Sequence, residues 1–174
     1  DHTPALRDAP LLAHFENLKA LPKSFEGVRI IKGAETNIVD FDGEIDLPIK
    51  YLKRMEIVIA SFHRDARKPS TIEDHTNAYK KVAENPYIDI IGHSGNPNFP
   101  YNYEEVIPLF AKMGKAVEIN ESSPTSRPNS EENCRKILSL CKKHEVYICI
   151  NSDAHFCSAI GHYDNSLEMI REIK

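Results

Sequence analysis

The sequence IVIASFH, at residues 57–63, is a short apolar run rich in β-branched side chains that ends in a histidine. Four further runs share this character: residues 28–35 (VRIIKGAE), 88–93 (IDIIGH), 116–120 (AVEIN) and 146–155 (VYICINSDAH). Short runs of this kind are typical of buried strands in a parallel sheet. We therefore predict five strands, each of which ends at or near a polar or ionisable residue.

The segments between these runs have the features of helices. Ser70 or Thr71 can cap a helix that runs to about Ala83, and Thr71 with Asp74 makes a rough capping box. Further helices are expected over residues 103–112, 130–144 and 165–173, and a turn is expected over residues 40–44. This alternation predicts an α/β fold with a parallel sheet. Because five strands alone would leave unpaired edges, we expect residues 1–174 to form a single incomplete domain, completed as a closed or distorted barrel.

Composition limits the classes of function. A net charge of −4 argues against a nucleic-acid-binding protein, because such proteins usually carry a basic surface. No apolar run approaches the roughly 20 residues that a membrane span requires. The four cysteines (Cys134, Cys141, Cys149 and Cys157) form no C-x-x-C pair, which argues against a zinc knuckle. Because Cys134 and Cys141 are seven residues apart on one helical face, we expect core thiols, in a reducing, cytoplasmic setting. A homo-oligomer is compatible with the sequence, which leaves the oligomeric state open.

Ionisable side chains lie at the ends of successive predicted strands. They are Glu35, His63, His93, Asp153 and His155. Sites in α/β proteins are built at the carboxyl ends of the strands, so these residues are expected to meet in space. A single histidine of this kind is more often structural than a ligand, but several on successive strands indicate a shared metal site. Imidazoles and carboxylates bind zinc, manganese or iron, and a carboxylate such as Glu35 can bridge two ions.

Short motifs lie at or near the ends of the predicted strands: Asp1-His2-Thr3, residues 32–37 (KGAETN), 61–63 (SFH), 93–97 (HSGNP) and 152–155 (SDAH). In this order they resemble T-D-H, the G-x-E strand, S-x-H, H-P-G-N-P and S-D-x-H of the PHP (polymerase and histidinol phosphatase) family, and the matches span nearly the whole chain. The segment 120–135 is most similar to the small single-domain bacterial phosphatases of that family.

The resemblance implies a distorted (β/α)7 TIM-like barrel with up to three divalent ions, of which zinc is the first expectation and manganese or iron the alternatives. By this resemblance, Glu35 would bridge two ions. His63 and His93 would complete the ligands of one of these two ions, and Asp153 would bind the other. His2 and His155 would bind a third ion. The family's opening H-x-H motif and one further histidine are absent. We therefore expect a chain truncated at its N-terminus and also at its C-terminus.

The predicted function is hydrolysis of a small-molecule phosphomonoester, with a metal-bound hydroxide attacking phosphorus in line. Glu35 and Asp153 are the predicted catalytic carboxylates, and Arg127 is predicted to bind the substrate phosphate. Two alternatives stay open. An amidohydrolase-type enzyme usually needs a bridging lysine, and no lysine here clearly ends a strand. A non-catalytic metal-binding scaffold is the other.

The remaining histidines match no ligand position of the family. They are His14, His75, His144 and His162. We expect His14 and His75 to be solvated helix residues and His144 to lie at the end of a helix.

Overall fold

The computed structural model describes residues 1–173, whose centre is a five-stranded parallel sheet. Its strands are β3 (Gly33–Asn37), β4 (Ile57–Ser61), β5 (Ile90–Ile91), β6 (Ala116–Asn120) and β7 (Ile148–Asn151). The helices are α1 (Leu12–Asn17), α2 (Ile49–Leu52), α3 (Ile72–Glu84), α4 (Tyr103–Lys112), α5 (Ser123–Ser126), α6 (Ser130–Lys143) and α7 (Asp164–Glu172), with short 3-10 helices at Leu18–Ala20 (η1) and Cys157–Ala159 (η2). The predicted α/β class with a parallel sheet is confirmed.

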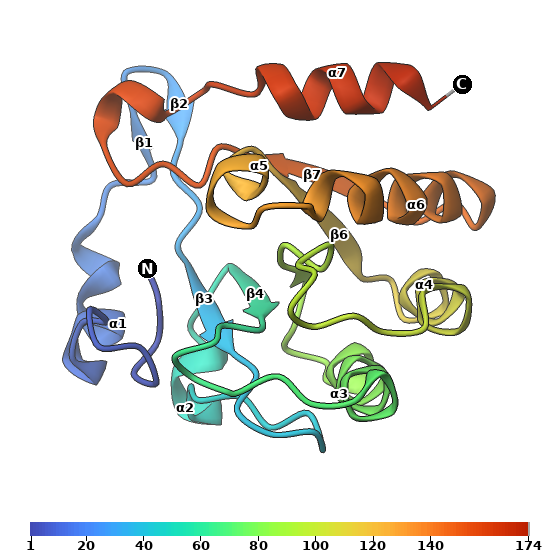
Figure 1. Ribbon diagram of the computed structural model, residues 1–174. Coiled ribbons are helices and arrows are strands. Elements are labelled where there is room, and N and C mark those ends of the chain that lie inside the picture. Colours follow the sequence, from blue (N-terminus) through green and yellow to red (C-terminus); the bar gives the residue numbers. More distant parts are fainter. Residues whose placement is uncertain (174) are drawn as a thin grey trace.

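The order of the strands in the sheet is the same as their order in the chain, β3-β4-β5-β6-β7. Parallel strands joined in this order by right-handed crossovers place their connecting helices on one face of the sheet. Figure 1 shows α3, α4 and α6 in an arc outside the strands. The carboxyl ends of all five strands therefore lie at one edge, where the ionisable residues follow.

A closed barrel is not confirmed, because the sheet is open over residues 1–173 and β3 and β7 are its two outer strands. Asp1 and Thr3 lie beside β3: the Glu35 N–H donates to the Asp1 carbonyl (3.0 Å), and the Thr3 hydroxyl donates to the Glu35 carbonyl (3.2 Å). His2 forms a parallel bridge with Glu35 at the same place. Five strands and this short segment are fewer than the about eight strands that close a barrel filled by side chains.

The first predicted strand, residues 28–35, is wrong as a single element. Val28–Arg29 forms β2, which pairs antiparallel with β1 (Ser24–Phe25), and β3 begins only at Gly33. The physical reason is the turn at Glu26 and Gly27, both of which have positive φ (47° and 82°), as a tight hairpin requires. The apolar side chains of this hairpin are exposed, so its apolar composition does not indicate a buried strand.

The predicted helices agree closely with the observed ones. Thr71 accepts a hydrogen bond from the Asp74 N–H, and Asp74 reciprocates at the Thr71 N–H, which is the predicted capping box of α3. Helix α6 ends at Lys143, with His144 as its C-cap. No helix among residues 1–173 has the length and apolar character needed to cross a membrane.

The core lies between the sheet and the helices and is rich in aromatic rings. Phe62, next to the predicted ligand His63, stacks on Phe99 with ring centroids 4.7 Å apart. Cys134 and Cys141 are buried, as predicted, whereas Cys157 is exposed, so the prediction of four core thiols is wrong at that position. Cys157 lies in η2, a short 3-10 helix that buries none of its residues.

His75 is fully buried, so the prediction of a solvated helix residue is wrong. Its Nδ1–H donates to the Pro100 carbonyl (2.8 Å), and its Nε2 accepts from the Ser70 N–H (2.9 Å). Phe62 and Phe99 surround the ring. Both ring nitrogens are thus satisfied only in the neutral form, and burial lowers the pKa of His75.

This burial predicts a contribution to stability that depends on pH. Above the unfolded pKa of about 6.5 the ring is neutral in both states, and the full stability is present. As the pH falls below that value, His75 is protonated in the unfolded chain but stays neutral in the folded protein. The free energy of unfolding therefore falls by at most about 1.4 kcal/mol per pH unit. Urea unfolding at pH 7.5 and 5.5 should show a smaller loss in His75→Gln than in the wild type. Equal losses in the two proteins would contradict this role.

Candidate metal centre

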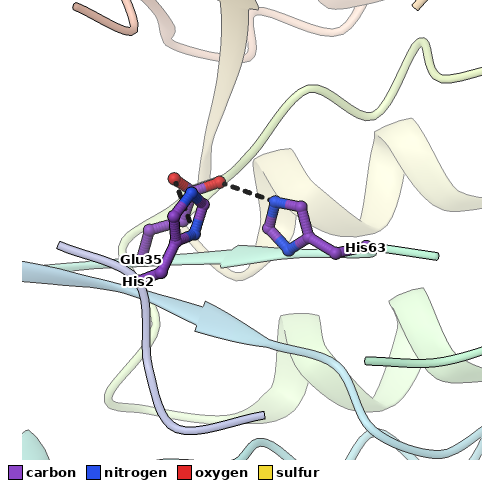
Figure 2. Close-up of side chains that lie close together, drawn as sticks. All are labelled: His2, Glu35 and His63. Carbon is purple, nitrogen blue, oxygen red and sulfur yellow. Dashed lines mark ion pairs between the residues drawn. The ribbon is translucent and has the colours of Figure 1, made fainter. Parts of the chain in front are cut away.

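Three histidine rings surround the carboxylate of Glu35 at the carboxyl edge of the sheet. His63 Nε2 lies 3.4 Å and His93 Nε2 lies 3.2 Å from Oε1 of Glu35, whereas His2 Nδ1 lies 3.6 Å from Oε2. The two Nε2 atoms of His63 and His93 are 3.0 Å apart. Figure 2 shows the Glu35 carboxylate beside the rings of His2 and His63, with a dashed line to each ring. The ligand atoms of His2, Glu35 and His63 all lie within 4.8 Å of one another.

The sheet explains why residues so distant in sequence meet. Glu35 lies within β3, and His63 and His93 each follow their strands, β4 and β5, by two residues. Gly92 lets β5 approach β4 closely, because a Cβ at this position would lie 2.0 Å from the Ser61 hydroxyl oxygen. His93 then turns with a positive φ of 24°, which is unusual for a residue other than glycine. Its side chain is almost completely buried, with 1% exposed.

Hydrogen bonds of neighbouring residues determine which nitrogen of His63 faces the carboxylate. The amide nitrogen of Asn37 donates to Asp46 (2.8 Å) and to Thr3 (3.2 Å), so the amide oxygen of Asn37 is the acceptor for His63 Nδ1–H at 2.7 Å. In the neutral ring, Nε2 therefore carries a lone pair that is directed at Glu35 and His93. Outer hydrogen bonds of this kind orient the histidine ligands of metal sites.

The local electrostatics favour an ionised Glu35 carboxylate and lower the pKa of the rings of His2 and His93. Burial opposes ionisation of Glu35, but the interactions of the carboxylate with the rings of His63 and His93 outweigh burial and hold the pKa of Glu35 well below the usual range. Burial lowers the pKa of His2 and of His93, despite the opposing effect of the Glu35 charge. Nδ1 of His2 is buried and has no hydrogen-bond partner among the described residues. Such a donor set of neutral imidazoles and one carboxylate fits a divalent cation.

A second group of polar side chains follows β6 and β7. Asp153 Oδ2 accepts from the Asn120 amide (3.1 Å) and lies 3.8 Å from the Arg127 guanidinium. The same guanidinium donates to Asn120, Ser123 and Ser126 at 3.1–3.4 Å, and only 14% of the Arg127 side chain is exposed. Arg127 is therefore held in place beside Asp153.

His155 lies at the rim of the site. Its side chain is 73% exposed, its Nδ1 is 3.7 Å from Asp153 Oδ1, and its ring centroid is 6.5 Å from that of His2. The structure thus brings His2, Glu35, His63 and His93 into direct contact, and brings Asp153, Arg127 and His155 together as a neighbouring group. His2 lies against Glu35 and His63 more closely than against His155, its expected partner on a third ion.

A cavity of about 780 Å³ lies away from this centre. It is lined by Lys32 and Glu56, which precede β3 and β4, and therefore lies toward the amino ends of these strands. None of the predicted site residues lines it. Of the other histidines, His14 lies 2.6 Å from the Asp1 carboxylate and contacts Phe15.

Sequence reasoning missed three polar residues that support the site: Asn37, Glu118 and Asn120. Residues two apart in a strand share a face, and both β3 and β6 carry glutamate and asparagine at this spacing (Glu35 with Asn37, Glu118 with Asn120). This repeated Glu-x-Asn pattern is the signal that could have identified them.

The chain is closely similar to several bacterial proteins named probable phosphatase. It is 43% identical to one from Acetivibrio thermocellus over 173 residues, which are 99% of this chain and 72% of the relative. It is 45% identical to one from Clostridium novyi, with 99% of this chain and 71% of the relative covered, and 43% identical to one from Caldanaerobacter subterraneus, with 99% and 69% covered. No protein-family model matches the chain.

At this identity and coverage, the chain belongs to the family of these bacterial probable phosphatases.

Proposed function

We propose that the protein is a metal-dependent phosphatase of the PHP family that hydrolyses small-molecule phosphomonoesters. The single observation that carries the proposal is the convergence of three imidazole nitrogens on the two oxygens of Glu35. The names of the relatives support the reaction class, since each is called a probable phosphatase. The motifs of the chain support the family.

The arrangement of His63, His93 and Glu35 supports the metal. With Nδ1 of His63 donating to Asn37, two imidazole Nε2 atoms and a carboxylate oxygen face one another at 3.0–3.4 Å. Lone pairs so placed repel one another unless a proton or a cation lies among them. Of the divalent ions that this donor set accepts, we propose zinc first, with manganese or iron as alternatives. His63, His93, Glu35 and His2 would hold ions on the two sides of the Glu35 carboxylate, with Asp153 and His155 as further ligands.

Bound divalent ions would lower the pKa of a water molecule toward neutrality and neutralise charge that develops on the phosphoryl group. The residues of the chain would supply the rest. Arg127 is fixed by three hydrogen bonds through one of its terminal nitrogens. Its other donors can hold phosphate oxygens without a further loss of side-chain freedom. Asp153, beside Arg127, would assist proton transfer.

We extend the proposal to the fold: the open sheet is part of a distorted (β/α)7 barrel. The support is the strand order, because consecutive parallel strands with helices on one face are the arrangement found in (β/α) barrels. A doubly wound sheet would instead reverse its strand order at a switch point, and β3 to β7 contain no such reversal.

Metal removal tests the proposal directly. Dialysis against a chelator should abolish hydrolysis of an aryl phosphate, and zinc or manganese should restore it. Glu35→Gln should bind less metal and lose at least about 100-fold in kcat/KM, more than the 10–100-fold typical of residues that only orient a ligand. Glu105→Gln, an exposed glutamate that pairs with Lys80 on the helices, is the matched control and should keep both metal and activity.

Activity that survives complete removal of metal would contradict the proposal. Stoichiometric metal binding without turnover on any phosphomonoester would favour a metal-binding scaffold instead.

Arg127→Ala tests the phosphate site. Loss of a hydrogen bond to a charged group costs about 1.5–3 kcal/mol, so KM for the aryl phosphate should rise about 10–100-fold. Arg127→Lys should recover only part of this loss, because lysine lacks the planar, two-pronged donor geometry of arginine. Arg135→Ala is the control, since Arg135 pairs with Glu172 on the surface. An unchanged KM in Arg127→Ala would remove this residue from the substrate site.

A further inference from the structure

Glu118 is a buried carboxylate that belongs to none of the ligand positions described above. It lies in β6, is 5% exposed, and has no cationic side chain within 4 Å among residues 1–173. Its Oε2 accepts from the backbone N–H of His93 (2.7 Å) and from the amide of Asn120 (3.4 Å). Its Oε1 accepts from the amide of Asn151 (2.6 Å). Burial of a carboxylate without an ion pair is costly, so the N–H groups around it must compensate for the lost solvation.

The hydrogen bond from His93 to Glu118 lies at a residue whose backbone has an unusual conformation. His93 has left the sheet with a positive φ, and its N–H points to the Glu118 carboxylate instead of to a strand. This backbone conformation directs the imidazole toward His63 and Glu35. Glu118 therefore influences the geometry of the histidine group, which consists of the rings of His2, His63 and His93 around Glu35, although it contacts none of these rings.

Asn120 connects Glu118 with the second group of the site, which contains Asp153 and Arg127. It shares a face of β6 with Glu118, donates to Glu118 and Asp153, and accepts from Arg127. Asp153, like His93, is a non-glycine residue with positive φ (52°). The backbone of His93 and the side chain of Asp153 are thus both hydrogen-bonded to neighbouring side chains of β6.

We infer that Glu118 is a positioning residue that fixes the backbone of His93 and, through Asn120, couples the histidine group to the Asp153–Arg127 group. This inference rests on the proposed function where it concerns catalysis, and on the geometry alone where it concerns the histidine rings.

Glu118→Gln is the first variant. An amide has one acceptor oxygen, so its NH2 must face either the His93 N–H or the Asn151 NH2, and one donor is left without an acceptor. We expect the ring ¹⁵N signals of His93 and His63 in the metal-free protein to shift. We also expect kcat/KM and metal affinity each to fall about 10–100-fold.

The second variant exchanges the two groups. In Glu118→Gln combined with Asn151→Asp, the amide at position 118 can donate to the carboxylate at position 151 and still accept from His93. The pattern of donors and acceptors is restored while the charge has moved. A positioning role predicts that the histidine signals and most of kcat/KM return. No recovery in a folded double variant would mean that the charge at position 118 itself is required, which overturns the inference.

Glu121→Gln is the matched control. Glu121 accepts hydrogen bonds from Asn165 and from the Ser166 N–H at the start of α7, so its loss should lower the Tm and leave the histidine signals in place. If Glu118→Gln behaves like this control, with a lower Tm but unchanged histidine signals and kcat/KM, Glu118 is merely structural and the inference is wrong.

Two further measurements keep the test decisive. If Glu118→Gln does not fold, Asn120→Ala should raise KM through Asp153 and Arg127 and, through the lost hydrogen bond to Glu118, also shift the His93 ring signals; if either stays unchanged, the coupling is overturned. If the wild type neither binds metal nor hydrolyses phosphomonoesters, the proposed function fails, and the histidine spectra of the metal-free variants still decide whether Glu118 positions His93.

Discussion

The carboxylate of Glu35 is the group around which the site is built. It is largely withdrawn from water, which would favour its protonated form, yet the rings of His63 and His93 stabilise its charge at 3.2–3.4 Å. Burial meanwhile keeps the rings of His2 and His93 toward the neutral form. An ionised carboxylate and several imidazole nitrogens that face one another form a donor set that fits a divalent cation.

The rest of the fold positions the side chains around Glu35. Parallel strands in chain order bring Glu35, His63 and His93 to one edge, and Gly92 allows β5 to approach β4 closely enough for His93 to reach the carboxylate. Asn37 fixes the ring of His63 and, through Asp46 and Thr3, ties the first residues of the chain to β3. The aromatic core beneath, with Phe62 stacked on Phe99, gives the segment that carries His63 a rigid base.

The sequence predicted which strand-end side chains lie close together, but it did not predict the polar residues that support them. Strand-end residues such as His63 and His93 could be identified because parallel strands in sequence order must present their carboxyl ends together. Glu118 was missed because it lies inside a buried strand and not at its end, and its sign in the sequence is the Glu-x-Asn spacing that β6 shares with β3. The hairpin before β3 was missed because Glu26-Gly27 indicates a turn less strongly than the apolar residues that follow it indicate a strand. Burial of His75 depends on packing against Phe62 and Phe99, which are distant in sequence.

The closure of the sheet was the other prediction that local sequence could not decide, because closure depends on the number of strands and their stagger, whereas each run specifies only one strand.

Anomalous diffraction from crystals grown with zinc or manganese tests the central claim most directly, because it locates the ion without reference to activity. The account predicts a peak, present only above the absorption edge of the metal, at about 2.0–2.2 Å from a Glu35 oxygen and from the Nε2 atoms of His63 and His93. Crystals that contain the metal but show no anomalous peak at these atoms would contradict it.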